Sequence, residues 1–287
     1  ISFIALVVVF TIIMSNPTAI LPPPPDFGSI SLTGKAVDFH RSLLVGIREP
    51  HLMLPIIDYI EEHQLYDEAS IKALRIQVVR ATRMVDLLGD LTGEDMSEAR
   101  DALQKELVDA EQAADSAMKL IKDPELWGKI QANTEGSSFG ALVLDYGFPD
   151  DILDRVYHLG RLNYQAGRYE DAYSALQVYR TLLTYLGPKQ HHKYMLSSLW
   201  GSLACAILTG QFDASVDLIG KLFELYQYES SGPSRPVGEG AGNYAESVAV
   251  LIHWSLFALF RAPSPSLCLS PKLVMLLTRV KALQAII

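Results

Sequence analysis

Positive charge is scarce in this sequence of 287 residues. Its 24 Lys and Arg residues stand against 33 Asp and Glu residues, so the formal net charge is -9 at pH 7. A protein whose main task is to neutralise phosphates needs a cationic surface. The composition therefore argues against a dedicated nucleic-acid-binding protein, and little direct RNA contact is expected.

Cysteine is scarcer still, because the sequence contains only Cys205 and Cys268. Cys205 lies beside the apolar stripe of an expected helix, which favours a buried free thiol. Free thiols are typical of proteins in reducing compartments. We therefore expect a cytoplasmic protein.

Several sequence patterns that mark active sites are missing as well. The chain has no phosphate-binding glycine motif, no CxxC pair and no HExxH motif. We therefore predict that the protein is not an enzyme. We also predict that it has no catalytic residues, no cofactor-binding residues, no metal site and no cofactor.

A few polar residues could in principle carry chemistry, and a structural role is the simpler interpretation of each. His191-His192 could bind a metal, but no carboxylate or cysteine stands at ligand spacing, so we expect a surface feature. His253, beside Trp254 in an apolar segment, is expected to be packed and hydrogen-bonded rather than catalytic. Asp150-Asp151 stands where a helix N-terminus favours negative charge.

The dominant pattern is helical, since no strand-rich segment with period-two alternation is present. Two helical hairpins are expected in tandem between Asp150 and Tyr226, with turns at Gly167 and Gly210. The two glycines lie about 40 residues apart, which is typical of stacked helix pairs in solenoids. Glycine enters the left-handed region without a Cβ penalty, so Gly210 should have a positive φ.

Large apolar and aromatic side chains follow the helices of both expected hairpins. Five tyrosines are expected to pack in and around the first hairpin rather than stack on bases. They are Tyr157, Tyr164, Tyr169, Tyr173 and Tyr179. The second hairpin begins with an apolar stripe of period 3.6, in which Trp200 is expected to be buried between the hairpins. The stripe consists of Leu196, Leu199, Trp200, Leu203, Ala204, Ile207 and Leu208.

The segment from Met96 to Lys122 predicts a long and mostly solvated helix with a narrow, alanine-rich seam. The seam consists of Leu103, Leu107, Ala110, Ala114, Ala117, Leu120 and Ile121. It could bind a partner helix or dock on the protein's own helical stack, and we favour the second interpretation. Asp123-Pro124-Glu125 then begins a new helix, with aspartate at the cap and proline at the first helical position.

The earlier part of the chain predicts two less regular hairpins over residues 36–89. Pro55 is expected either to delay the start of its helix or to kink it. Arg75, Arg80 and Arg83 follow one helical stretch. We expect them on a solvated helix surface, with direct RNA contact as the alternative.

The first fourteen residues are strongly apolar and pose a separate question. They could form the core of a signal peptide or a membrane anchor, which would make the protein a membrane-tethered adaptor. No basic region precedes them, however, and they are too short for an ordinary membrane span. A polar run follows Met14 at once. We therefore favour Met14 as the natural start and expect no membrane association.

Four regions are expected along the chain. Residues 1–35 combine the atypical apolar start with a proline-rich tail, and residues 36–145 form an N-terminal helical region. Residues 146–260 form a helical-repeat region, and residues 261–287 form an atypical C-terminal segment. The expected fold is all-α, a right-handed superhelical stack of helical hairpins of the TPR or HEAT type.

The residues also resemble a known family. The segments 196–208 and 251–260, with their Trp200 and His253-Trp254, look like the e subunit of eukaryotic translation initiation factor 3. Shorter matches support the resemblance, which covers roughly residues 36–260. They are His51-Leu52 with Pro55, Tyr66-Asp67-Glu68, Met84-Val85-Asp86, Asp123-Pro124-Glu125, Phe212-Asp213-Ala214, and Asp145-Tyr146 through Tyr169.

The resemblance implies a non-catalytic subunit whose helical repeats lead into a PCI domain over residues 146–260. The family's winged helix has no counterpart here, because the resemblance stops near Arg261. The resemblance also implies two kinds of partner during initiation of protein synthesis. These are other subunits of initiation factor 3 and the small ribosomal subunit. The alternative is a PCI-type subunit of the proteasome lid or the COP9 signalosome.

Overall fold

The computed structural model describes residues 49–125, 148–149, 151–184, 194–231, 247 and 250–258. Within these ranges the backbone forms helices, turns and loops, and no strand occurs. The all-α class that was predicted from the sequence is therefore confirmed, while the superhelical stacking stays a prediction. Among the described helices, none combines the length and the apolar character needed to cross a membrane.

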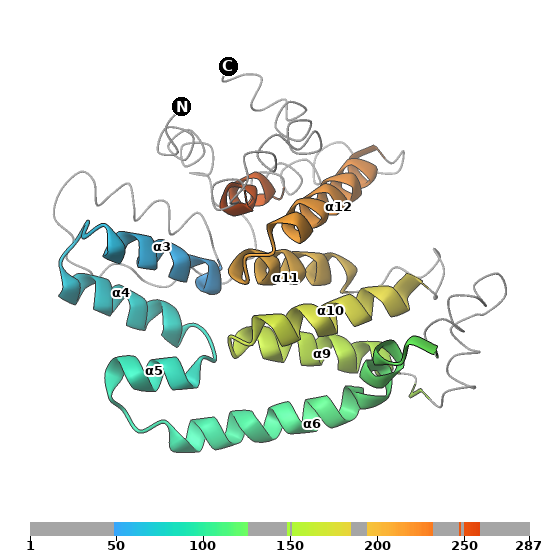
Figure 1. Ribbon diagram of the computed structural model, residues 1–287, viewed down its shortest axis with the longest axis horizontal. Coiled ribbons are helices and arrows are strands. Elements are labelled where there is room, and N and C mark those ends of the chain that lie inside the picture. Colours follow the sequence, from blue (N-terminus) through green and yellow to red (C-terminus); the bar gives the residue numbers. More distant parts are fainter. Residues whose placement is uncertain are drawn as a thin grey trace. The chain divides into compact units, whose positions relative to one another are not determined.

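The chain divides into two compact units, Ile1–Thr82 with Gly210–Ile287, and Arg83–Thr209. The first unit contains helices α3 (Pro50–Glu62), α4 (Glu68–Arg80) and α12 (Phe212–Ser231), and a helical segment over residues 250–258 (Figure 1). The second unit contains α5 (Val85–Thr92), α6 (Ser97–Lys122), α9 (Ile152–Gln165), α10 (Tyr169–Thr184) and α11 (Met195–Leu208). The two helices of the second predicted hairpin, α11 and α12, therefore fall in different units.

Helices α3 and α4 form a hairpin in the first unit. Helix α3 begins at Pro50, where the missing N–H is no loss, and it runs on through Pro55. The late start considered for this helix was therefore wrong. Asp67 caps α4 by accepting a hydrogen bond from the Ser70 backbone N–H at 2.9 Å. The buried face of α4 consists of Ile71, Leu74, Val78 and Val79, as its period of 3.6 predicts.

In the second unit, α9 packs on α10 and on α6, and α10 packs on α11. The core of this unit gathers apolar side chains from α6, α9 and α10, among them Leu107, Ile152, Val156, Tyr179 and Leu182. The predicted turn between α9 and α10 is confirmed, because Gly167 has a φ of 81°. Gly210, which follows α11, has a φ of 72° and confirms the second predicted turn.

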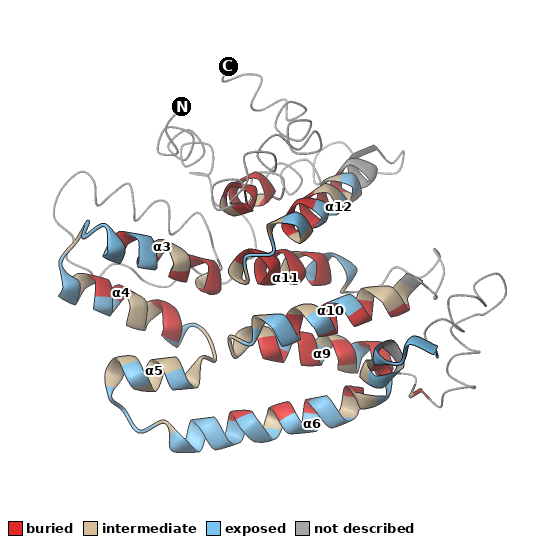
Figure 2. Ribbon diagram, viewed as in Figure 1, coloured by how far each residue is buried: buried red, intermediate tan, exposed pale blue. Residues whose placement is uncertain are grey.

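Helix α6 buries one narrow seam and exposes most of its other residues (Figure 2). The buried residues are Leu103, Leu107, Ala110, Ala114 and Ala117, and all five belong to the core of the second unit. Because α6 packs on α9, the seam docks on the protein's own helices. The small alanines allow the two backbones to approach closely. The interpretation that we favoured for this helix is thus confirmed.

Helix α11 confirms part of the predicted apolar stripe and corrects the rest. Leu199, Leu203, Ala204 and Ile207 are buried as expected. Leu196 is 36% exposed and Trp200 is only partly buried, whereas Ser198 and Ser202 are fully buried. The reason is a polar contact with α10: the Arg180 guanidinium donates to the Ser198 carbonyl oxygen at 3.1 Å and to the Ser202 hydroxyl. This contact holds the serine face of α11 against α10. The expected burial of Trp200 is therefore confirmed only in part.

Gly160 on α9 lies directly against the Leu176 side chain of α10. A Cβ atom at this position would lie 2.9 Å from the Cγ and Cδ2 atoms of Leu176. Leu176 has little room to move, because a Cβ atom at Gly201 on α11 would lie 3.0 Å from its Cδ1 atom. Because Gly160 on α9 and Gly201 on α11 have no side chain, the buried side chain of Leu176 on α10 fits between them.

Gly160→Ala is expected to lower the free energy of unfolding by up to about 2 kcal/mol. Overpacking costs about 1–3 kcal/mol, and the better helix propensity of alanine returns about 1 kcal/mol. Urea unfolding of the full chain measures the change. Gly89→Ala on α5 is the matched control, since its new Cβ meets mainly a flexible methionine side chain. In a Leu176→Ala background the Gly160→Ala substitution should cost nothing; an unchanged cost there would contradict the explanation.

Candidate interaction surfaces

The candidate residues for metal binding or catalysis do not assemble a site in the part of the chain that the structure describes. Within those ranges no group of three His, Cys, Asp or Glu residues is placed to hold a metal ion. His191 and His192 lie outside the described residues, so their expected surface role stays a prediction. Residues 136–140 have the spacing Gly-x-Ser-x-Gly but also lie outside. That spacing marks a nucleophile only between a strand and a helix, and the sequence predicts no strand there.

The predicted acidic helix start is confirmed for Asp151, whereas Asp150 lies outside the described residues. Asp151 precedes α9, and its Oδ1 atom accepts a hydrogen bond from Arg155 Nε at 2.8 Å. This hydrogen bond lowers the pKa of Asp151. The Asp151 side chain therefore stays a charged carboxylate, which is favourable at the positive N-terminal end of α9.

His253 and Trp254 are both buried, which confirms that the histidine is packed. Burial lowers the pKa of His253 to about 4, so the imidazole is neutral at physiological pH. Its Nδ1 atom has no hydrogen-bond partner among the described residues. The expected hydrogen bond is therefore not found at that nitrogen.

Four of the five tyrosines contribute to packing around the first hairpin, as predicted. Tyr179 is fully buried, and burial raises the pKa of Tyr179 to about 12. Tyr157 stacks on Tyr194 with ring centroids 4.1 Å apart and contacts Tyr179 at 5.5 Å. Tyr164 and Tyr169 contact each other across the turn at 5.9 Å. In these contacts the tyrosine rings pack against other side chains of the same protein.

The three arginines that the sequence places together are separated in the structure. Helix α4 ends at Arg80, and Arg83 belongs to the other unit. Arg75 pairs with Asp58 at 2.7 Å and with Glu61 at 2.6 Å, and Arg83 pairs with Glu106 at 2.6 Å. The expectation of one helical stretch with three solvated arginines was therefore wrong, because carboxylates distant in sequence neutralise two of them.

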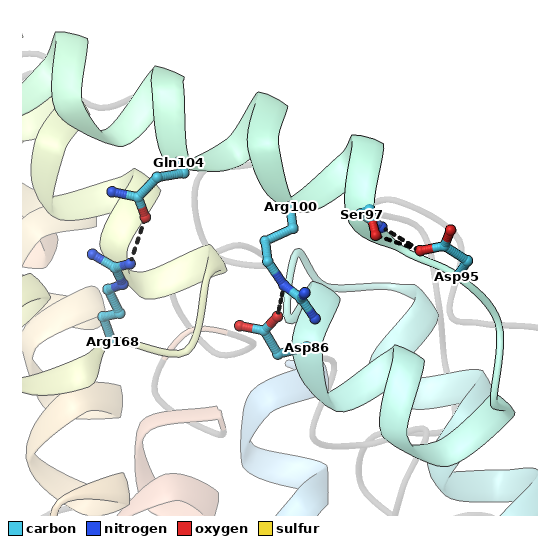
Figure 3. A network of polar contacts seen from close by, with 6 residues as sticks. All are labelled: Asp86, Asp95, Ser97, Arg100, Gln104 and Arg168. Carbon is cyan, nitrogen blue, oxygen red and sulfur yellow. Dashed lines mark hydrogen bonds and ion pairs between the residues drawn. The ribbon is translucent and has the colours of Figure 1, made fainter.

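A set of exposed polar contacts connects α5, α6 and the turn before α10 (Figure 3). Arg100 on α6 pairs with Asp86 on α5, and Arg168 donates to Oε1 of Gln104 at 3.2 Å. Before α6, Asp95 accepts a hydrogen bond from the Ser97 backbone N–H at 3.0 Å. Since α5 buries none of its residues, polar contacts contribute much of its attachment to α6. This surface presents charges of both signs, as protein-binding surfaces commonly do.

The sequence analysis predicted helical hairpins in this region but missed the conformation of the turn between α3 and α4. The Leu65 N–H donates to the Ile60 carbonyl oxygen at 3.1 Å, and the Gln64 N–H donates to that of Glu61 at 3.0 Å. These are the two hydrogen bonds of a Schellman motif, in which glycine usually takes the left-handed position. Here Gln64 takes it with a φ of 50°, at a cost of about 1–2 kcal/mol. No glycine signals this turn, so the sequence could not reveal it.

Comparison with known proteins finds matches to the same family that the sequence resembles. Residues 44–163 match the family described as eIF3 subunit 6 N terminal domain. The e subunit of eukaryotic translation initiation factor 3 from Yarrowia lipolytica is 26% identical over 74% of this chain and 48% of its own length. The protein of that name from Monosiga brevicollis is 26% identical over 75% of this chain and 43% of its own length.

A plant relative agrees with these two. The protein of the same name from Arabidopsis thaliana is 27% identical over 73% of this chain and 46% of its own length. The chain thus spans about half the length of the curated relatives it matches. The resemblance predicted from the sequence is therefore confirmed: residues 44–163 match the eIF3 subunit 6 N terminal domain model, and about three quarters of the chain are similar to the e subunit of initiation factor 3.

Proposed function

We propose that the protein is a non-catalytic scaffold subunit of translation initiation factor 3 in the cytoplasm. It binds other subunits of that factor and the small ribosomal subunit. The observation that carries this proposal is the family match over residues 44–163, together with the shared name of the relatives above. That shared name favours initiation factor 3 over the proteasome lid and the COP9 signalosome.

The described surfaces support a role in protein contact rather than RNA contact. The guanidinium groups of Arg75 and Arg83 are paired with carboxylates, which lowers their availability to phosphates. The seam of α6 is already covered by the protein's own helices. Partner subunits therefore bind exposed side chains, and the helical units hold those side chains in place.

Co-purification tests the proposal. The full chain is tagged and expressed in eukaryotic cells, and bound proteins are identified by mass spectrometry at two salt concentrations. We expect other initiation factor 3 subunits at both concentrations and ribosomal proteins mainly at the lower one. Recovery of proteasome-lid or signalosome subunits in their place would refute the proposal.

A further inference from the structure

The turn after α3 exposes two large apolar side chains. Tyr59 is 54% exposed and Leu65 is 44% exposed, which are the highest values for large hydrophobic residues in the part of the chain described. Tyr59 stacks on His63 with ring centroids 4.0 Å apart, and the Nδ1 atom of His63 lies 3.0 Å from the Tyr59 carbonyl oxygen. The aromatic ring is therefore held in place at the surface rather than left to rotate freely.

The backbone of this turn does not by itself account for the exposure of Leu65. In a Schellman motif, the residue after the left-handed position commonly packs on the helix residue to which its N–H bonds. That residue is Ile60, which is buried, yet Leu65 keeps almost half of its surface exposed. Gln64 enters the left-handed region at the same point. Backbone strain of this kind is concentrated where a protein presents side chains for binding.

Carboxylates are frequent in the sequence around these two side chains. The segment of residues 58–75 contains five carboxylates against Lys72 and Arg75, a net charge of -3. The carboxylates are Asp58, Glu61, Glu62, Asp67 and Glu68, and all five residues are exposed. Arg75 pairs with the first two, and Asp67 accepts hydrogen bonds from Ser70. The ion pairs of this described segment, which join Arg75 to Asp58 and Glu61, involve neither Glu62 nor Glu68, which stand on either side of Leu65 in the sequence.

We infer that this acidic, apolar turn, formed by residues 58–68, is a docking site for a basic segment of a partner protein. The occupant has Lys or Arg residues on either side of a large apolar side chain. Its apolar side chain covers Tyr59 and Leu65, and its cations face Glu62 and Glu68. The inference deepens the proposed function and rests on it, because it gives the chemistry of one partner segment. The carboxylates repel RNA phosphates, and they equally repel the same turn of a second copy.

A peptide probe tests the chemistry of the turn. The probe is a fluorescent amphipathic peptide of alternating Lys and Leu character, and its counterpart has glutamate in place of every lysine. Fluorescence anisotropy with the purified full chain measures both affinities. We expect the basic peptide to bind at least about tenfold more tightly than the acidic one, with an affinity that falls as salt rises.

Two double variants locate that binding. Tyr59→Ser with Leu65→Ser, and Glu62→Lys with Glu68→Lys, should each weaken the basic peptide about tenfold or more. Val108→Ser and Glu98→Lys are the matched controls, because they change an exposed apolar residue and an exposed carboxylate on α6. Circular dichroism confirms that each variant is folded. Equal binding by the turn variants and the controls would overturn the inference.

Crosslinking within cells identifies the occupant. A photoreactive benzoylphenylalanine at position 59 should crosslink to a segment of an initiation factor subunit that carries Lys or Arg beside apolar residues. A crosslink to RNA, to a second copy or to a segment without basic residues overturns the inference. So does the absence of crosslinks when initiation factor subunits still co-purify, and in that case the proposed function stands. If those subunits do not co-purify, the proposed function fails. The peptide binding measurements alone then test whether the turn binds a basic segment.

Discussion

Ala114→Asp is expected to lower the free energy of unfolding by about 3–5 kcal/mol, the cost of a buried carboxylate without a partner. Ala114 is completely buried in the seam of α6, between Ala110 and Ala117. The seam belongs to the same core as Ile152 and Val156 of α9. Those neighbours are apolar, so they offer the new charge no hydrogen bond.

Urea unfolding at pH 7 measures this loss. Ser116→Asp is the matched control, because Ser116 is exposed on the same helix and takes the same new side chain. The control should change the free energy of unfolding by no more than about 0.5 kcal/mol. Burial disfavours the charged form of the introduced carboxyl group, so the loss should shrink as pH falls toward 5.

The same variant separates two interpretations of the seam. If the seam docks on α9 as described, Ala114→Asp destabilises the isolated chain. If it were a binding face for a partner helix, the isolated chain would keep its stability and lose the partner. A normally stable Ala114→Asp variant would therefore contradict the packing of α6 on α9.

Local features of this fold could be predicted well from the sequence. The period of 3.6 over α4 identified Ile71, Leu74, Val78 and Val79, because the buried face of a helix repeats along the chain itself. The turn glycines Gly167 and Gly210 were predictable for a similar reason, since a positive φ favours residues without a Cβ atom.

Features that depend on another helix could not be predicted in this way. Helix α11 is apolar over most of its surface, so its pattern allowed several buried faces. The contact of Arg180 with Ser198 and Ser202 selects one of them. Arg83 and Glu106 are likewise 23 residues apart, and no local pattern pairs them. The exposed turn at Gln64 gave no signal, because glutamine rarely takes a left-handed conformation.

Two buried histidines make the protein sensitive to mild acid. His51 in α3 and His253 in the helical segment over residues 250–258 belong to the first unit. Burial lowers the pKa of each from 6.5 to about 4. Between pH 6.5 and about pH 4 the unfolded chain binds protons at these imidazoles and the folded chain largely does not. Stability therefore falls as pH falls, by about 1.4 kcal/mol per pH unit for each histidine.

The loss attributable to each histidine should reach about 2 kcal/mol at pH 5 and level off near pH 4 at about 3 kcal/mol. Exposed carboxylates with lowered pKa values, such as Asp67 and Asp151, add their own loss only at lower pH. Urea midpoints between pH 7 and pH 5 therefore isolate the histidines. His253→Gln should reduce the pH slope by about half, whereas His63→Gln, which removes an exposed imidazole, should leave it unchanged. Equal slopes in all three proteins would show that His253 is not shielded from water in the folded chain.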